Sequence, residues 1–591
     1  MKNTKEKNAN TEYTRSYTNL RGMNPTDRQS DSFFYLENMY VDYEGGGDAV
    51  ESVPGFRKIL SAGEKIHSFA ISGTSDSKGA LLIHAGKHLY RLSVSERDSH
   101  KRLSQVGELA DAESNIFTFG NLTFVADGIS LWLISPEGQM RKISDDSVIS
   151  SCTKAALYDG RLFLSGSSAL PSQVFYSTPL SEENISFFPD AFFKESNAGV
   201  AVTDILSYEG ALWIFKTKDD GEGSIVCRKK SVKEKDYPIV RVFSRVSPKS
   251  RAVIFNQKIH FLGEGGLLAI EKPYCENDAE IVSLSDPIFS MLCKENFQRA
   301  DLGIWLGYLA VAFGERIYLA DPRGKNGGYD WYFINGVGEY KNDSRVYRYL
   351  SHAEESFDLH PHPDSVAGGE IISFTLPDEK AIFYSKEGNR RYRVYPTEEL
   401  TGGDFSPAES FFFDEKFLWF ATGESLYLFN NDKRGALPDS PSEENPYEEE
   451  KKLHENKIHQ SFYSFAGHAP KYIAATHYDD CGLPCYEKSS APDSLYLELC
   501  PFGESLFTLS VMTDGVRKSS FEISPSPIDF SALDFQHIGM HRGEGRDMRL
   551  SEKAVGWYKK QLVLSGNGFS SPFGIKSVSY RYRIKGASKK S

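Results

Sequence analysis

The sequence predicts an all-β protein, in which a β-propeller of about six to eight blades is followed by a smaller, β-sandwich-like domain. Three observations lead to this fold class. The chain of 591 residues holds 31 Tyr and 40 Phe, whose flat rings pack well on the half-buried face of a sheet. Short runs with an apolar residue at every second position recur along the chain. The spacing of these runs stays near the length of one propeller blade.

The repeating unit is a hairpin, in which a short apolar run meets a polar or glycine-containing turn and a second alternating run follows. A period of two places one face of a strand in a core and the other toward solvent. The segments with this pattern are 80–94, 117–135, 156–166 with 173–177, 205–227, 253–271, 304–321, 381–385 and 411–430.

The spacing of the hairpins distinguishes a propeller from an unrelated series of hairpins. The apolar centres of the later strands are Leu89, Leu131, Phe175, Val226, Leu268, Tyr318, Phe383 and Tyr427. The steps between them are therefore 42, 44, 51, 42, 50, 65 and 44 residues. Blades of four strands recur at roughly 40–50 residues, whereas turns in stacked sandwiches, the alternative, recur every 8–12 residues or so. We expect at least about six blades between residues 65 and 430.

Composition marks the boundaries of the predicted parts. We expect an N-terminal docking arm with the first strands over residues 1–60 and the propeller over 61–430. The longest step contains a polar stretch, residues 338–370, which we interpret as a loop insertion. Residues 431–460 are rich in Pro, Ser and Glu and predict a flexible, exposed, acidic linker. Strand-like alternation resumes over 461–591, the predicted C-terminal β-domain.

Charge and cysteine content limit the classes of function. The formal net charge is −13, whereas proteins that grip duplex DNA present a basic face to the phosphates. An acidic surface past which DNA slides stays compatible with this balance. The seven cysteines are an odd, scattered set, unlike a secreted disulfide framework. Without an apolar leader or a membrane-spanning run, we expect a cytosolic product with no membrane contact.

Three stretches of the chain contain short motifs that also occur in one known protein family. Residues 19–59 contain an N-M-Y-x-D element and a P-G-F-R element, made by Asn38, Met39, Tyr40, Asp42, Pro54, Gly55, Phe56 and Arg57. Residues 477–488 read HYDDCGLPCYEK. Residues 561–586 contain a P-F-G-I element, made by Pro572, Phe573, Gly574 and Ile575. The roles we expect for these residues are structural, with Pro54 and Gly55 setting a tight turn.

These stretches resemble the packaged-DNA stabilisation or tail-nozzle proteins of bacteriophages and prophages, although Val53 replaces the Arg that usually precedes the Pro-Gly pair. The resemblance implies a propeller-bearing subunit of the virion neck, made in the bacterial cytoplasm. It also implies a homo-oligomeric, hexameric ring below the portal that extends the DNA channel and helps retain packaged DNA. Portal or adaptor and tail proteins would be its partners, and contact with DNA would be transient and non-specific.

Histidine and cysteine residues near the second motif suggest a metal site. His477, Cys481 and Cys485 are four residues apart, with His459 and His468 upstream. Zinc needs four converging N or S ligands, and this spacing is loose. The sequence between the two cysteines favours a plain turn.

Other polar groups also fit structural roles better than chemical ones. His360 and His362 lie in the polar insertion, and the glycines of residues 263–266 lead into a strand rather than a phosphate-binding helix. Acidic pairs at 145–146, 219–220 and 479–480 would serve glycoside hydrolysis only if held across a cleft. Basic runs are few and lie at 228–235 and 390–393. The second interleaves Arg with Tyr and could touch DNA, but it fits a charged strand edge better.

The sequence therefore predicts no catalytic residue, no cofactor and no metal, and a structural role without enzymatic activity. Two alternatives stay open. One is a propeller enzyme of a phage tail that acts on glycans, and the other is a propeller scaffold that binds a protein partner.

Overall fold

The computed structural model describes residues 11–587 with internal gaps, and the side chains of residues 340–404 are outside the description. The gaps are 19, 27–31, 44–46, 48, 73–79, 94–102, 182–183, 195–199, 219–222, 232–235, 274–278, 324–327, 342–346, 352–356, 361–370, 376–380, 386–389, 397–403, 431–464, 467–469, 502–506, 524–545 and 567–572. The predicted linker, 431–460, therefore lies outside the described residues. No helix within the described ranges is long and apolar enough to span a bilayer.

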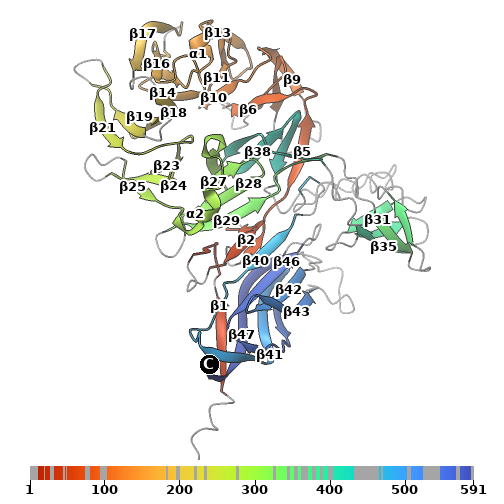
Figure 1. Cartoon of the computed structure of the whole chain (residues 1–591). Helices are drawn as coiled ribbons and strands as arrows, with labels where there is room; N and C mark the ends of the chain where they lie inside the picture. The colour runs from red at the N-terminus through yellow and green to blue at the C-terminus, as the bar shows by residue number, and fades with distance from the viewer. Residues whose placement is uncertain are drawn as a thin grey trace, which may run out of the picture. The chain divides into compact units, whose positions relative to one another are not determined.

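Seven four-stranded antiparallel sheets account for most of the described strands (Figure 1). In chain order they are β6 (Ile66–Ser72) to β9 (Leu103–Glu108), β10 (Asn115–Phe119) to β13 (Met140–Ser144), β14 (Lys154–Tyr158) to β17 (Phe187–Lys194), β18 (Val200–Tyr208) to β21 (Ile239–Ser244), β22 (Val253–Phe255) to β25 (Glu280–Ser283), β26 (Asp301–Trp305) to β29 (Asp330–Asn335), and β37 (Ser410–Asp414), β38 (Phe417–Thr422) and β39 (Ser425–Phe429) with β5 (Phe56–Ser61).

The first strands of these sheets lie next to one another around a centre. Contacts join β6 with β10, β14 with β18, β22 with β26, β26 with β37, and β37 back to β6. Apolar clusters fill the space between consecutive sheets, as where Phe163 and Val174 of one sheet meet Leu212 and Ile214 of the next. Sheets that pack face to face around a shared centre are the blades of a propeller. The predicted all-β propeller is confirmed.

Tight turns explain why these residues form hairpins. Asp159–Gly160 joins β14 to β15 (Arg161–Ser165) with φ angles of 50° and 67°, and Glu209–Gly210 joins β18 to β19 (Ala211–Lys218) with 50° and 65°. Two-residue loops with positive φ at both positions match the right-handed twist of the flanking strands. Glycine takes this conformation at no steric cost, so the second residue of each turn supports the fold locally.

The spacing predicted the blades correctly, with one exception. Seven of the eight predicted centres lie in the third strand of their sheet, for example Leu89 in β8 (His88–Ser93) and Tyr318 in β28 (Arg316–Asp321). Phe383 does not, because β34 (Ala381–Ser385) belongs to a separate five-stranded sheet. The period of two identifies a strand but not the sheet to which it belongs.

The prediction that residues 338–370 form a loop insertion is wrong. This region contains β30 (Gly338–Lys341), β31 (Tyr347–Ser351) and β32 (Phe357–His360), and β31 and β32 join β33 (Ile371–Thr375), β34 and β35 (Arg390–Pro396) in the five-stranded sheet. Its polar composition hid the strands, because strands can form with few apolar side chains when their backbones pair. β30 pairs with β36 (Asp404–Pro407).

The chain divides into two compact units. One comprises Lys58–Gly314 and Ala408–Tyr427, and the other comprises Met1–Arg57, Glu315–Pro407 and Leu428–Ser591. The second unit holds a β-sandwich of two sheets. The first sheet has β3 (Met39–Val41), β4 (Val50–Ser52), β47 (Phe573–Ala587), β41 (Tyr486–Pro501) and β44 (Arg546–Leu550), joined by β1 (Glu12–Thr18) and β45 (Val555–Trp557). The second has β2 (Tyr35–Glu37), β40 (Tyr472–Ala475), β46 (Lys560–Gly566), β42 (Phe507–Thr513) and β43 (Val516–Ile523).

The sandwich core follows from alternation along its strands. In β42 every second residue is buried, and the Phe507 ring stacks on Phe573 with centroids 4.4 Å apart. Aromatic pairs in this geometry add to the free energy of simple burial. Strands from both ends of the sequence share these sheets, since β4 pairs with β47.

Candidate functional site

Asn38 lies at the centre of a hydrogen-bonded junction in the unit that contains the sandwich. It is 2% exposed and has a φ of 56°, a left-handed conformation that Asn tolerates better than most residues. Its Nδ2 donates to the carbonyl of Lys471 at 2.8 Å, and its Oδ1 accepts from the backbone N–H of Asn335 at 2.8 Å. Its own N–H donates to the carbonyl of Phe333, and its carbonyl accepts from Val53. One residue thus links three distant segments.

The other residues of the N-terminal motif surround this junction. Met39 and Tyr40 are buried in β3, and Asp42 is 9% exposed. The Phe56 ring packs against Phe465 with centroids 4.7 Å apart. These residues contribute burial and backbone pairing.

The connection between β4 and β5 differs from the sequence-based expectation. Pro54 and Gly55 are buried, and Arg57 is exposed. No turn occurs at residues 53–55, and Gly55 does not take a positive φ. The prediction of a tight turn at Pro54 and Gly55 is wrong, because the chain passes directly from one strand to the next and needs no reversal there.

The C-terminal motif meets the N-terminal one. Phe573 exchanges hydrogen bonds with the Ser52 hydroxyl, its N–H donating at 3.2 Å and its carbonyl accepting at 3.4 Å. Gly574 pairs with Glu51, and Ile575, fully buried, lies beside β4. Pro572 is outside the described residues. Residues 521 positions apart in sequence therefore form one edge-to-edge contact.

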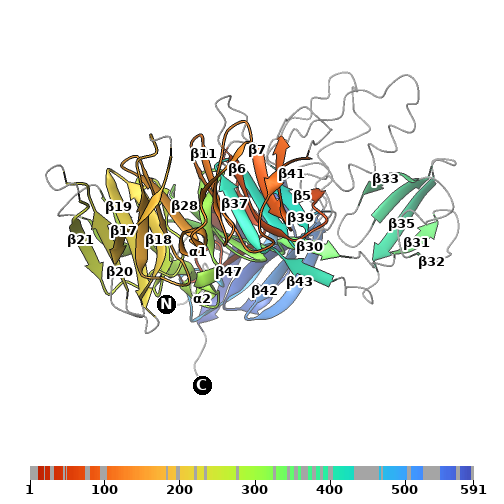
Figure 2. The same ribbon diagram turned by 90° about the horizontal axis from the view of Figure 1, so that it is seen from above.

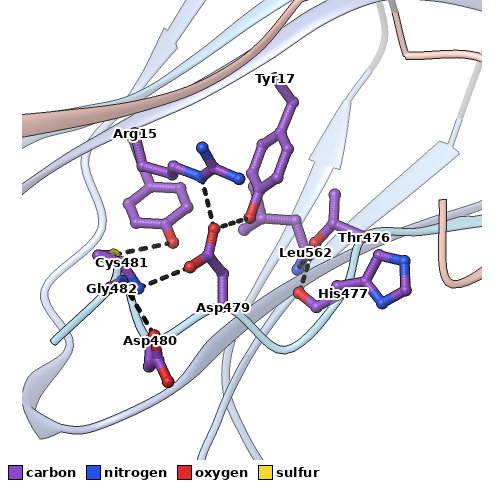
Figure 3. Close-up of polar contacts among 10 residues, drawn as sticks. Arg15, Tyr17, Thr476, His477, Asp479, Asp480, Cys481, Gly482 and Leu562 are labelled. Atoms are coloured by element: carbon purple, nitrogen blue, oxygen red, sulfur yellow. Dashed lines mark hydrogen bonds and ion pairs between the residues drawn. The ribbon is translucent and has the colours of Figure 1, made fainter. Parts of the chain in front are cut away.

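Asp479, in the second motif, fastens strand β1 (Figure 3). Its Oδ2 accepts from Arg15 Nε at 2.5 Å and from the Tyr17 hydroxyl at 2.7 Å. Its Oδ1 accepts from the N–H of Cys481 at 2.6 Å. Burial, followed by the nearby carboxylate, raises the pKa of Tyr17 well above its ordinary value, so this hydroxyl stays a donor.

His477, Cys481 and Cys485, the members of this set that the structure describes, form no group that could hold a metal. Cys481 has a φ of 56° and Gly482 one of 71°, and the N–H of Leu483 donates to the carbonyl of Asp480 at 3.0 Å, so this segment is a turn. His477 is 3% exposed and lies across Asp479 from Cys481 (Figure 3). Burial raises the pKa of the Cys481 thiol, which disfavours the thiolate that metals bind.

Within the described ranges, no group of three or more His, Cys, Asp or Glu residues could hold a metal. His459 and His468 lie outside those ranges, and the expected absence of metal stays a prediction. Cys485 is exposed, and none of the five cysteines whose side chains the structure describes forms a disulfide.

A buried charged cluster, not anticipated from sequence, lies beside this turn. Lys560 Nζ is 2.6 Å from Glu552 Oε2 and 2.7 Å from the Ser490 hydroxyl, and the lysine and glutamate side chains are each 1% exposed. Burial lowers the pKa of Lys560, while Glu552 opposes that change. The ammonium also lies 4.7 Å from the centre of the Trp557 ring. Because the cluster is sealed from solvent, it holds strands together rather than meeting a substrate.

A second lysine, Lys488, is fully buried in the same region. Its Nζ donates to the carbonyls of Leu483, Tyr486 and Tyr558 at 2.7, 2.9 and 3.1 Å. Burial lowers its pKa. In sequence, both lysines look like solvated surface residues, and no pattern distinguishes them.

A second set of charges lies on the first strands of the blades. Lys154 begins β14, Asp204 lies in β18, Asp301 begins β26, and Arg251 precedes β22. Asp204 Oδ2 accepts from the N–H of Ala252 at 2.6 Å, at a strand position next to a register shift. Burial lowers the pKa of Lys154 to about 8, with Arg251 acting in the same direction and the two aspartates against it. Burial raises the pKa of both aspartates.

This inner-strand cluster brings together several titratable groups whose pKa values are shifted by burial. Perturbed groups cluster at functional sites, and they also occur in structural ion networks. The formal charges of its two basic and two acidic side chains cancel. The cluster therefore joins the inner strands without producing a large net electrostatic field. A charged residue within an otherwise apolar strand, as in the run VAVTDIL, is the sequence signal that could have revealed Asp204.

The remaining candidate groups take structural positions or are not described. Asp146 caps the short helix α1 (Ser147–Ser150) by accepting from Val148 N–H at 2.8 Å. The glycines at 263 and 266 flank the turn from β23 (Lys258–Gly263) to β24 (Gly266–Glu271), as expected. His360 ends β32 and residues 390–393 lie in β35, where side chains are not described; His362 and residues 219–220 lie outside the described ranges.

Comparisons with known proteins add little beyond the fold. No protein-family model and no curated protein matches the chain. Among solved structures, the WD40 domain of SCAP from fission yeast aligns at 9% identity over 64% of this chain and 98% of its own, with a TM-score of 0.31. The AfRom2 CNH domain aligns at 8% identity over 58% of this chain and 99% of its own, with a TM-score of 0.25. At such scores these likenesses carry no argument about function.

Proposed function

We propose that the chain is a structural subunit of a bacteriophage or prophage virion: a ring-forming neck or tail-nozzle protein below the portal. It extends the DNA channel and helps retain packaged DNA, and it acts by geometry without catalysis. The proposal takes its identity from the motif resemblance in sequence.

The observation that supports it is the convergence of the three motif stretches. Asn38, Asp479 and Phe573 come from the start, the later part and the end of the chain, and all three lie in one unit. Asn38 joins the segments that contain Lys471 and Asn335. Asp479 holds β1, and Phe573 is bonded to Ser52. Residues that connect backbones in this way fix a shape, which is what a protein acting by geometry requires.

The propeller suits lateral assembly. Its outer strands form a rim, and a head-to-tail contact that repeats by a closing rotation produces a ring. The family resemblance implies that six copies of the chain form the ring. An excess of acidic residues, −13 over the chain, favours passage of DNA over capture of it, because a basic lumen would bind phosphates through counterion release.

Particles from an induced lysogen test this proposal. We expect mass spectrometry of purified particles to find the chain at a fixed ratio to the portal protein. Particles made without it should lose their DNA after packaging. A chain that is absent from particles, or that cleaves a capsular glycan with turnover, would contradict the proposal.

A further inference from the structure

The outer strand of one blade is an apolar edge open to solvent. β21 follows β20 (Gly223–Arg228) as the last strand in the order β18–β19–β20–β21 and lies on the outside of that sheet (Figure 2). Ile239, Val240 and Val242 are 49%, 48% and 48% exposed. Pro238, Arg241 and a register shift at Cys227/Arg228 limit backbone pairing along this edge, so a partner would contact it through side chains. Three exposed β-branched residues on one edge therefore indicate a contact surface.

The same edge also carries basic side chains, Arg241 within β21 and Arg245 directly after it. On β21 itself, the Arg241 guanidinium lies 5.6 Å from the centre of the Phe243 ring. Arg245 follows the strand and is exposed. We call β21 with Arg241 and Arg245 the basic edge.

A complementary surface occurs on other blades of the same unit. The stretch from Leu103 to Met140 has five acidic residues and no Lys or Arg. Glu108, Asp111 and Glu113 are exposed, and Ile129 is 64% exposed. We call these four residues the acidic knob.

The acidic knob is held rigid by Asp127, which is 2% exposed. Asp127 accepts hydrogen bonds from the N–H groups of Ala110 at 3.2 Å, Ile129 at 3.0 Å and Ser130 at 2.6 Å, and from Trp132 Nε1 at 3.0 Å. These bonds tie the loop after β9 to the turn before β12 (Leu131–Ile134). An exposed isoleucine in a fixed turn loses little conformational entropy when it enters an interface.

We infer that the basic edge of one copy packs against the acidic knob of a second copy, and that this contact joins neighbours in the ring. The two surfaces are different and lie on different blades, so the contact is head-to-tail and can close into a ring. Opposite charges flank apolar residues on both sides, an arrangement that gives an interface both affinity and register. The inference rests on the proposed function and names the interface that the ring requires.

Nucleic acid is the competing ligand for a basic surface. Phosphate binding is supplied by Lys and Arg, and needs no exposed aliphatic residues between them. Ile239, Val240 and Val242 occupy that position on the basic edge. A protein surface with acidic residues and an exposed isoleucine can pair with the arginines of the basic edge and also cover its aliphatic side chains.

The test uses the full-length protein in mass photometry and multi-angle light scattering. Val242→Lys and Arg241→Glu/Arg245→Glu should each weaken self-association by about tenfold or more. Val516→Lys and Val555→Lys are matched controls, because these valines are 57% and 61% exposed in the other unit and should change nothing. Circular dichroism checks that every variant is folded.

Charge exchange decides the pairing of the two surfaces. Glu108→Lys/Glu113→Lys should also weaken assembly, and combining it with Arg241→Glu/Arg245→Glu should restore it. Failure of that rescue would overturn the inference, as would unchanged assembly in both charge variants.

Two further results separate this inference from the proposed function. A ring that assembles normally in every edge variant refutes the interface and leaves the proposed function standing. A wild-type protein that is monomeric at all concentrations, or whose basic edge binds duplex DNA in place of a second copy, refutes the inference. Absence from virions refutes the proposed function independently.

Discussion

Replacing Asn38 tests whether a motif residue has an architectural role. Asn38→Gly keeps the left-handed backbone but removes both side-chain hydrogen bonds, so the N–H of Asn335 and the carbonyl of Lys471 lose their partner. Each buried polar group left unpaired costs about 1–3 kcal/mol. We expect a loss of about 2–4 kcal/mol in the local free energy of unfolding. Asn38→Ala should cost about 1 kcal/mol more, because alanine is strained at a positive φ.

Hydrogen exchange read by mass spectrometry suits this measurement, since a protein of two units need not unfold in one step. Peptides that cover β2, β3 and β29 should exchange faster in both variants, while peptides from β18 to β21 should keep their wild-type rates. The reasoning is wrong if Asn38→Gly changes local stability by less than about 0.5 kcal/mol, or if Asn38→Ala equals Asn38→Gly.

Four further outcomes follow from the contacts described above. Asp479→Asn should speed exchange in β1 by about tenfold, whereas Asp480→Asn should not, because only the first residue holds Arg15 and Tyr17. Lys560→Met should cost about 3–5 kcal/mol by leaving Glu552 buried without its partner, and adding Glu552→Leu should recover most of this in urea unfolding. The folded-state pKa of Lys154 is about 8 against a reference of 10.5, so the unfolded state binds more protons between these values. Wild-type stability relative to Lys154→Met should therefore rise with pH across that window, by up to about 3 kcal/mol in thermal unfolding. Elemental analysis should find no stoichiometric zinc, and one zinc per chain lost in Cys481→Ser would contradict this.

The blades were predictable because their signal is local. Alternation, the turns at Asp159–Gly160 and Glu209–Gly210, and a spacing near one blade length all depend on neighbouring residues. Phe383 shows the limit of that signal. Its strand was identified correctly, but which strand pairs with which depends on contacts distant in sequence, and the period of two carries no information about them.

The candidate site was less predictable, because its contacts join distant parts of the chain. The motifs indicated Asn38 and Phe573, but their partners Lys471 and Ser52 could not be read from spacing. Lys560 looked like a surface residue, since nothing near it in sequence places Glu552 or Ser490 beside its ammonium group. Buried ion pairs are built by the tertiary fold, and composition does not reveal them.

Cryo-electron microscopy of the particle neck tests the central claim most directly. The account predicts a closed ring of this chain below the portal, with the basic edge of each copy against the acidic knob of the next and a central passage for DNA. A neck without density for this chain, or a single copy attached elsewhere on the particle, would contradict it.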